Sequence, residues 1–315
     1  MIYSDFLTYT DKGLYCHYGD FYLDPKQGVN RAVISHAHGD HAAGGNNVVY
    51  STSPTAAIMV LRLKKNAGKE FFSFPYKQTF KVAEVSITFY PAGHILGSAL
   101  VLMEYESTRY LYTGDFKLQP DETCEAAELI TADVLITETT FAHPDTTHPD
   151  AYTEIIKLNA SNHNILLGAY SLGKSQRLVN LINRYCPGKT VLLHHSMLAI
   201  TKIYEDFSFP PGKYEPYNRK LMKSPDQGFV YIVPPLTFES YFRAKNVLRV
   251  FASGWKRLQY QNDLELYISD HADWNDILHT IKIVNPLEVW TLHGDGQHLK
   301  NHFAEKLPVK ILNSC

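Results

Sequence analysis

The sequence predicts an α/β fold, because strand-like runs alternate with helical segments along much of its 315 residues. Runs rich in β-branched and aromatic residues predict the strands. Apolar residues spaced three and four apart predict the helices. Most of the strand-like runs end in His, Asp or Glu. Because the carboxyl ends of strands in open α/β sheets collect ligands, these endings indicate a site along one edge of a sheet.

The predicted elements follow in chain order. Strands are expected at residues 31–36 (RAVISH), 85–94 (VSITFYPAGH), 98–105 (SALVLMEY), 109–116 (RYLYTGDF), 132–138 (ADVLITE), 228–235 (GFVYIVPP), 264–271 (LELYISDH) and 287–295 (LEVWTLHGD). Helices are expected at 53–66 (SPTAAIMVLRLKKN), 151–162 (AYTEIIKLNASN), 175–186 (SQRLVNLINRYC) and 271–284 (HADWNDILHTIKIV). Residues 207–235 are rich in Pro, Gly, Tyr and Lys, so we expect loops there around a single strand.

Composition narrows the class of protein. The four cysteines lie far apart, which favours neither a disulfide framework nor a cysteine zinc site and indicates a reducing compartment. No basic leader precedes an apolar run, and no stretch reaches the roughly 18 apolar residues of a membrane helix. We therefore expect a cytoplasmic protein without a membrane partner.

Charge is distributed unevenly along the chain. The whole sequence carries a formal charge of −2, yet residues 142–253 hold 13 Lys and Arg against 8 Asp and Glu, a local charge of +5. The rest of the chain is correspondingly acidic. A basic block within an acidic body is consistent with a surface that binds phosphates.

The most informative motif is the segment ISHAHGDHAAGG, in which His36, His38, Asp40 and His41 fall within six residues after an apolar run. Imidazole and carboxylate groups are ligands that zinc accepts, and a tight loop directs alternate side chains to different sides. A histidine-rich surface turn is the alternative. Three histidines and an aspartate in H-x-H-x-D-H spacing favour a metal loop, with room for two adjacent ions.

Further ligand candidates occur where other predicted strands end: His94 in PAGHILGSA, Asp115 in YTGDF and His293 in TLHGD. These segments, in this order and over nearly the whole chain, resemble the metallo-β-lactamase superfamily. The resemblance implies a four-layer αββα sandwich. It also implies one metal held by His36, His38 and His94, and a second held by Asp40, His41 and a further histidine. Asp115 would bridge the two, and Asp24 in FYLDP would support the loop without binding metal.

Two more strand ends indicate a branch of that superfamily. Glu138 ends ITE, His271 ends YISDH, and about 110 residues of basic sequence lie between Glu138 and FASG. This arrangement resembles the β-CASP nucleases, with Glu138, His271 and His293 in the positions of motifs A, B and C. The resemblance implies a catalytic domain formed by residues 1–141 and 254–315, and an inserted α/β β-CASP domain at 142–253 that acts as a substrate-binding lid.

The implied function is zinc-dependent hydrolysis of phosphodiester bonds in nucleic acid, with two Zn²⁺ ions, or Mn²⁺ in their place, and His271 as general acid oriented by Glu138. YLDP, HAHGDHA, AYSLGKSQR and SDHADW resemble bacterial ligase-associated DNA exonucleases, also described as messenger-RNA 3′-end processing factors. DNA is therefore the expected substrate, in end processing or repair, with a DNA ligase or helicase as functional partner. His293 at motif C matches the RNA-processing branch, so an RNA-processing ribonuclease is the alternative. A small-molecule thioester or lactone hydrolase would need neither the insertion nor the Glu138–His271 pair.

A second motif competes with this interpretation. Residues 168–175, GAYSLGKS, satisfy the P-loop pattern between a strand and a helix. A nucleotide hydrolase of this type also needs a later apolar strand that ends in an Asp to hold Mg²⁺, and this half of the chain has none. Nucleotide hydrolysis is therefore a weaker hypothesis than nuclease activity. The same helix start could instead bind a nucleic-acid phosphate or form an ordinary turn. The substrate-binding candidates are Ser171, Gly173, Lys174, Ser175 and Arg177. Arg243 and Lys245 would add charge, and Tyr214, Tyr217 and Tyr241 would stack bases or simply pack.

Overall fold

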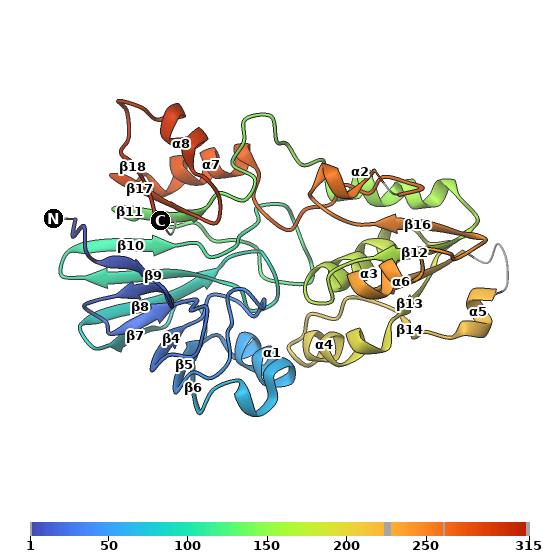
Figure 1. Cartoon of the computed structure of the whole chain (residues 1–315), viewed down its shortest axis with the longest axis horizontal. Helices are drawn as coiled ribbons and strands as arrows, with labels where there is room; N and C mark the ends of the chain where they lie inside the picture. The colour runs from blue at the N-terminus through green and yellow to red at the C-terminus, as the bar shows by residue number, and fades with distance from the viewer. Residues whose placement is uncertain (1, 224–227, 261, 313–315) are drawn as a thin grey trace. The chain divides into compact units, whose positions relative to one another are not determined.

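The computed structural model describes residues 2–223, 228–260 and 262–312, which form two compact units (Figure 1). The first unit comprises Met1–Pro120, Glu125–Thr147 and His271–Cys315. The second comprises Asp121–Cys124 and His148–Asp270. The second unit is therefore an insertion, and its main segment begins at His148 instead of the expected 142 and ends at Asp270 instead of the expected 253. Its role as the substrate-binding domain remains a prediction.

Two β-sheets form the centre of the first unit. One contains six strands in sequence order: β1 (Leu7–Thr10), β2 (Gly13–Cys16), β3 (Phe21–Leu23), β4 (Arg31–Val33), β5 (Val48–Ser51) and β6 (Glu70–Ser73). The other contains seven strands in the order β18 (Val309–Ile311), β17 (Glu288–Leu292), β11 (Val134–Glu138), β10 (Thr108–Tyr112), β9 (Ala99–Tyr105), β8 (Val85–Pro91) and β7 (Thr79–Val82). Strands β10, β11, β17 and β18 run parallel, so their carboxyl ends lie at one edge.

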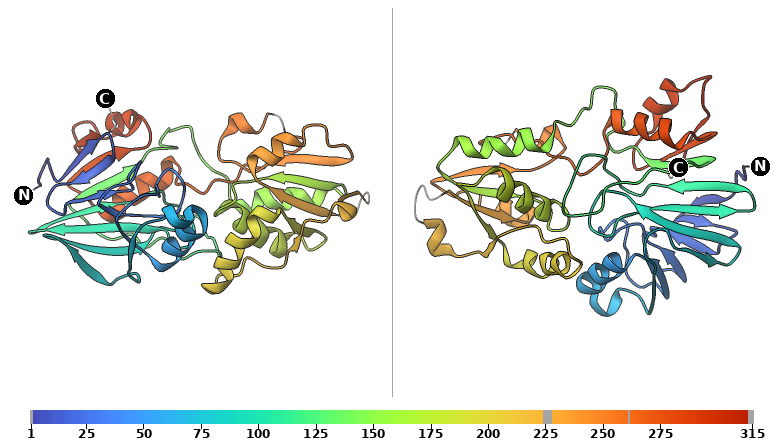
Figure 2. Two further views of the ribbon diagram at one scale, coloured as in Figure 1. Left: turned by 60° about the horizontal axis from the view of Figure 1, so that its bottom comes forward. Right: turned by 180° about the vertical axis from the view of Figure 1, so that it is seen from behind.

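The apolar faces of the two sheets pack against each other. Leu23 and Val33 of the first sheet share one buried cluster with Ile87, Val101 and Trp290 of the second. The outer face of the second sheet is covered by α7 (Trp274–Val284), through Ile277 and Ile281, and by α8 (Gln297–His302). Helix α1 (Ser53–Leu63) lies beside the first sheet, as Figure 2 shows. The predicted αββα sandwich is confirmed.

The second unit is a parallel sheet with helices on both faces. Its strand order is β14 (Glu215–Pro216), β13 (Thr190–Leu193), β15 (Phe229–Val233), β12 (Asn164–Gly168) and β16 (Val247–Phe251). One face packs on α2 (Ala151–Ile155), α3 (Lys174–Tyr185) and α4 (His195–Asp206). The opposite face packs on α5 (Arg219–Lys223) and α6 (Pro235–Ser240). Because helices cover both faces of this sheet, its strands are continuously apolar and do not alternate between apolar and polar residues.

One predicted strand is wrong. Residues 264–271 are irregular apart from a single bridge between Ala252 and Leu266. Side chains take the hydrogen bonds that a neighbouring strand would have made: Tyr267 N donates to Glu154, and Lys174 Nζ donates to Ile268 O. The residues are strand-like in composition because Leu266 and Ile268 are buried in the apolar cluster. Burial alone does not provide a strand with a partner.

The other predicted elements match the structure apart from their ends. Short 3₁₀ turns, Lys64–Asn66 and Ile156–Ala160, end the predicted helices at 53–66 and 151–162. Residues 207–235 contain β14 and α5 in addition to the expected strand β15. Among the described residues, no helix combines the length and apolar character that crossing a bilayer requires.

Candidate metal centre

The loop that carries His36, His38, Asp40 and His41, called here the histidine loop, follows β4. Hydrogen bonds from Ser35 and His41 to Asp24 hold it in place. Asp24 Oδ1 accepts a hydrogen bond from Ser35 N at 2.7 Å, and Oδ2 accepts one from the Ser35 hydroxyl. Oδ2 also lies 2.9 Å from His41 Nδ1 and 3.0 Å from the hydroxyl of Tyr112, which donates to it. Asp24 is buried, so these contacts supply the partners that a buried carboxylate needs. They orient His41 with Nε2 facing away from Asp24.

Four predicted ligands meet in one cluster. The ligand atoms of His36, His38, His94 and Asp115 all lie within 4.8 Å of one another. His38 Nδ1 lies 3.1 Å from His36 Nε2 and 3.0 Å from His94 Nε2. Asp115 Oδ2 lies 3.5 Å from His36 Nε2 and 3.8 Å from His94 Nε2. Their elements are the loop after β4, the turn between β8 and β9, and the turn after β10.

The remaining predicted ligands form a group that adjoins Asp115 and His36 through His41. His41 Nε2 is 3.4 Å from Asp115 Oδ2 and 3.9 Å from Asp40 Oδ2. The rings of His41 and His293 are 4.9 Å apart between centroids. Asp40 is largely exposed, with 76% of its side chain accessible. Thus the structure brings all seven predicted ligands together, with Asp115 next to both groups.

Glycine allows the turn after β10 to approach the histidine loop. Gly114, which precedes Asp115, has φ +52°, a conformation that costs other residues strain. A Cβ atom at this position would lie 2.5 Å from the Ser35 hydroxyl oxygen. Gly114 therefore lets the loop bearing His36 and the turn bearing Asp115 lie against each other.

Burial and charge determine the protonation of the cluster. Burial holds the pKa of His36 well below its usual value, so this imidazole is neutral. Burial also opposes charge on His41 and Asp115, but their attraction outweighs it. The pKa of His41 is raised well above its usual value and that of Asp115 is held well below. The Asp115 carboxylate thus favours positive charge beside it, which a proton or a divalent cation supplies.

A carboxylate and a histidine form a second feature next to the cluster. His271 Nδ1 lies 2.9 Å from Glu138 Oε2 and 3.2 Å from Oε1. Glu138 is buried and also accepts hydrogen bonds from Phe116 N at 3.0 Å and from the Thr140 hydroxyl at 2.6 Å. His271 remains 26% exposed, and its Nδ1 is 3.9 Å from Asp115 Oδ2. The carboxylate is therefore held by several donors and fixes the orientation of the ring.

The donor set fits divalent cations. Imidazole nitrogens and carboxylate oxygens are zinc and manganese ligands, and neutral histidines such as His36 need lose no proton to bind. A histidine that binds a metal through one ring nitrogen usually forms a hydrogen bond through the other. His41 Nδ1 has such a partner in Asp24, and His36 Nδ1 has one in the Ser35 hydroxyl, 3.0 Å away. The ligand atoms of Asp115, Glu138 and His271 also lie within 4.8 Å of one another. His271 thus has the geometry of either an acid or a ligand.

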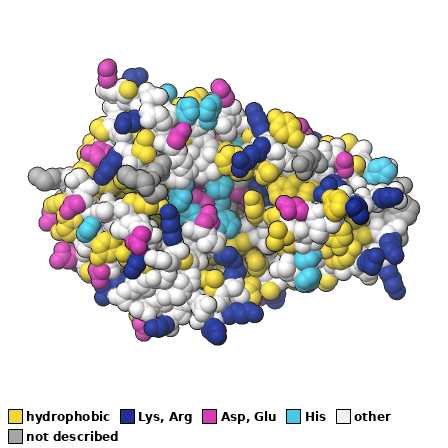
Figure 3. All heavy atoms as spheres, in the orientation of Figure 1, with side chains coloured by type: hydrophobic (Ala, Val, Ile, Leu, Met, Phe, Trp, Pro, Cys, Tyr) yellow, Lys and Arg dark blue, Asp and Glu magenta, His cyan; other side chains and the backbone are white. Residues whose placement is uncertain are grey.

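Sequence reasoning did not single out several supporting residues. Tyr112 binds Asp24, Thr140 binds Glu138, and Arg62 donates to the carbonyl of Ala37 in the histidine loop. Tyr112 is the first residue of the YTGDF segment that contains Asp115, and Thr140 follows Glu138 by two residues, which is their only sequence signal. Figure 3 shows histidine and acidic side chains beside one another near the middle of the face in view.

The predicted phosphate-binding segment of the second unit is occupied by internal contacts. Lys174 Nζ is 2.6 Å from Ile268 O and 3.0 Å from Asp270 Oδ2. Arg177 Nη1 is 2.6 Å from Ser269 O and 2.9 Å from Asp270 Oδ1, and both cations are buried. At the start of α3, Gly173 N donates to Gln176 Oε1.

The neighbouring residues of this segment are also engaged. Ser175 N donates to Tyr170 O, and the Ser175 hydroxyl donates to the carbonyl of Ser171. These bonds use the groups that a P-loop or a phosphate site would direct at its ligand. The structure thus shows a structural role for Ser171, Gly173, Lys174, Ser175 and Arg177, while their binding of substrate stays untested. Tyr217 stacks on Tyr231 with centroids 3.8 Å apart, and Tyr214 donates to Glu205, so both pack as the alternative expected.

Known proteins resemble this chain over most of its length. It is 35% identical over 93% of its residues to a "Probable DNA ligase" of Opitutus terrae, of which it spans 30%. It is 28% identical over 85% of its residues to an "RNase J-like protein" of Methanocaldococcus jannaschii, of which it spans 82%. An "Endoribonuclease YSH1" of Eremothecium gossypii is 30% identical over half of this chain, which spans 26% of that protein.

Structural comparison supports the fold. A crystal structure of a protein of unknown function from Enterococcus faecalis V583 matches with a TM-score of 0.60, covering 90% of this chain and 79% of that one, at 17% identity. No family model matches the sequence. The αββα sandwich, the inserted α/β unit, the histidine loop and the relatives agree. The chain belongs to the β-CASP branch of the metallo-β-lactamase superfamily.

Proposed function

We propose that this chain is a metal-dependent nuclease that hydrolyses phosphodiester bonds of nucleic acid, most readily those of DNA. The observation that supports this proposal is the meeting of seven candidate ligands next to the Glu138–His271 pair. A small-molecule hydrolase of the same fold needs the metal ligands but not this pair. The relatives named as nucleases support the same reaction class.

Two Zn²⁺ ions, with Mn²⁺ as the alternative, would be held by this cluster. His36, His38 and His94 would bind one ion, Asp40, His41 and His293 the other, and Asp115 Oδ2 lies beside both sets of ligands. When bound, such ions activate water as a nucleophile and neutralise charge on phosphate oxygens. Asp24 would keep His41 Nε2 directed toward the site through its hydrogen bond to Nδ1.

His271 would supply a proton to the leaving sugar oxygen. Its Nδ1 contacts both oxygens of Glu138, so Nδ1–H donates to the carboxylate and Nε2 is the atom that can transfer a proton. The buried negative charge of Glu138 stabilises the imidazolium form. Because Glu138 also accepts from Phe116 N and Thr140, the pair is held rigidly before substrate binds.

DNA is the proposed substrate because the first unit and the insertion together match a protein named "Probable DNA ligase" over 93% of this chain. An exonuclease that trims ends would prepare substrates for a ligase, or act beside a helicase. The RNase J-like relative, of which the chain spans 82%, supports RNA as the second candidate. In either case the inserted unit, with its excess of Lys and Arg, would contribute substrate binding.

The experiment combines metal analysis with digestion of end-labelled oligonucleotides. Purified chain should contain about two equivalents of zinc or manganese, and should shorten single-stranded or double-stranded DNA in a ladder that starts at one end. Chelation should abolish digestion, and restored metal should recover it. A faster reaction with RNA of the same sequence would transfer the proposal to RNA. Hydrolysis of a thioester without cleavage of either polymer would refute it.

A further inference from the structure

A loop of the second unit presents aromatic and cationic side chains to solvent. Between β16 and residue 261, the segment S-G-W-K-R-L-Q-Y includes a 3₁₀ turn, Lys256–Leu258. Tyr260 is 83% exposed and Trp255 is 38% exposed, although such side chains usually contribute to a core. Lys256 and Arg257 are also exposed, and the Arg257 guanidinium lies 5.0 Å from the centroid of the Trp255 ring.

Side-chain hydrogen bonds hold the loop that carries these exposed residues. Gln259 is buried, and its amide donates to Ser253 O at 3.2 Å while its carbonyl accepts from Leu266 N at 3.0 Å. Asn262 bonds both the N–H and the carbonyl of Phe251, each at 3.1 Å. Gln259 therefore ties this loop to Ser253 and Leu266, and Asn262 forms two further hydrogen bonds to Phe251. A loop held by side-chain hydrogen bonds that displays large aromatic side chains is typical of a binding surface.

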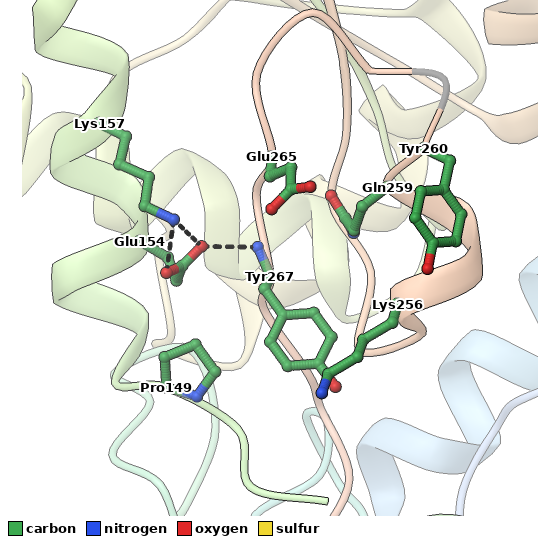
Figure 4. Close-up of a pocket in the computed structure, with 8 residues that line it drawn as sticks. All are labelled: Pro149, Glu154, Lys157, Lys256, Gln259, Tyr260, Glu265 and Tyr267. Carbon is green, nitrogen blue, oxygen red and sulfur yellow. Dashed lines mark hydrogen bonds and ion pairs between the residues drawn. The ribbon is translucent and has the colours of Figure 1, made fainter.

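The same loop forms one wall of a pocket with a volume of about 300 Å³ (Figure 4). This volume is at the lower end of the range for small-molecule sites. The pocket lies within the second unit, apart from the residues of the candidate metal centre. The lining residues that matter here are Glu154, Lys157, Lys256, Tyr260, Glu265 and Tyr267. Figure 4 shows the rings of Tyr260 and Tyr267 at this pocket.

Charges in the pocket favour a neutral, flat group over a phosphate. Glu154 is neutralised by Lys157 Nζ, at 2.7 Å from each carboxylate oxygen, and by Tyr267 N at 2.8 Å. Glu265 is exposed and would repel a phosphate inside the pocket. Lys256 lines the pocket, and Arg257, the next residue, is exposed and lies over the Trp255 ring, so the loop carries two cationic side chains that can contact phosphates. Stacking surfaces with cations nearby match a single-stranded nucleic acid.

We propose that this pocket, with Tyr260 as its stacking surface and Lys256 and Arg257 as its phosphate contacts, binds one base and the adjacent backbone of a single-stranded nucleic acid. The inference deepens the proposed nuclease function by naming a substrate subsite outside the metal centre. Stacking is tolerant of sequence because every base has a π-face, so the subsite serves binding without sequence selection.

The test measures binding without cleavage. A fluorescein-labelled single-stranded decanucleotide of DNA, and its RNA equivalent, are titrated with the full chain in EDTA, and binding is followed by anisotropy. Tyr260→Ala should weaken binding by about 5- to 150-fold, the range that one stacked base supplies, and Tyr260→Phe should restore it. Lys256→Met should reduce the slope of log K against log salt concentration by about 0.7. Phe242→Ala is the matched control, since Phe242 is 62% exposed beside Arg243 but does not line the pocket.

The outcomes separate this inference from the proposed function. Binding by Tyr260→Ala within twofold of wild type, or an equal loss in Phe242→Ala, would overturn the subsite. Displacement of the oligonucleotide from the wild-type chain, but not from Tyr260→Ala, by inorganic phosphate alone would also overturn it, because the pocket would then bind phosphate rather than a base. Tyr260-dependent binding by a chain that cleaves no nucleic acid would support the subsite and refute the nuclease. Cleavage that is insensitive to Tyr260, with unchanged binding, would do the reverse.

Discussion

Replacing His271 by alanine separates the roles of acid and metal ligand. In the structure, His271 contacts Glu138 through Nδ1, while His36, His38 and His94 gather around Asp115 without it. A positioned general acid contributes about 10² to 10⁴ in rate, which corresponds to about 3 to 5 kcal/mol of barrier. We therefore expect His271→Ala to lower kcat by that factor and to leave the metal content unchanged.

The leaving group gives this prediction its sharpest assay. A sugar oxygen needs a proton to depart, whereas p-nitrophenolate is a stable anion. His271→Ala should therefore lose about 10²-fold or more on a dinucleotide but little on the p-nitrophenyl ester of thymidine 5′-phosphate. Glu138→Gln removes the charge that stabilises the imidazolium and should show the same pattern. His279→Ala, an exposed histidine of α7, is the matched control and should retain full activity.

Two results would refute this reasoning. Loss of a metal equivalent from His271→Ala, measured by mass spectrometry, would make His271 a ligand, as the proximity of Asp115, Glu138 and His271 also permits. An equal loss of rate on both substrates would show that His271 does not donate the proton. With the first result, Glu138 would act by holding a metal ligand rather than a general acid.

Three further predictions test the supporting structure. Asp24→Ala removes the hydrogen bonds that orient the histidine loop, so metal affinity measured by competition with a chelator should fall about 10- to 100-fold; unchanged affinity would contradict that role. Arg177→Met leaves Asp270 buried without its guanidinium partner, so urea unfolding should show a loss of about 3 to 5 kcal/mol, and a loss below about 1 kcal/mol would count against the buried network. Burial and the neighbouring Asp273 raise the pKa of Asp276 to about 6 from 3.8, so the folded chain holds this proton more tightly than the unfolded chain. The contribution of Asp276 to the free energy of unfolding should be largest below pH 3.8 and should be lost as the pH rises through 6. Because the side chain is partly exposed, we expect this loss to be about 1 kcal/mol. Asp276→Asn should remove this fall, and an unchanged pH profile of thermal unfolding in the variant would refute the assignment.

The family was predictable because the motifs that carry the resemblance are local, and the resemblance implied the αββα sandwich. His36, His38 and His41 lie within one loop, and their spacing indicates metal chemistry without a structure. The expected strand at 264–271 shows the limit of local pattern. Its apolar residues are buried, but side chains from α2 and α3 satisfy its backbone. Hydrogen-bond partners distant in sequence decide whether an apolar segment becomes a strand.

The interpretation of Lys174 and Arg177 shows the same limit for charge. In sequence they follow a glycine-rich turn and indicate phosphate binding, but in the structure both are buried on Asp270. Conversely, Lys256 and Tyr260 belong to no motif, yet the structure displays them at a pocket. A sequence identifies which groups carry charge; only packing determines whether that charge faces solvent or another residue.

The sequence by itself determined the ligand types, their order along the chain and the fold class, since each depends on residue identity and short-range periodicity. Only the tertiary structure decided that His94, Asp115 and His293 lie within reach of the histidine loop, that Glu138 bonds His271, and that Tyr260 is exposed at a pocket. These are contacts between residues as many as 252 positions apart, as for His41 and His293, and they form because sheet pairing and core burial fix where each turn lies.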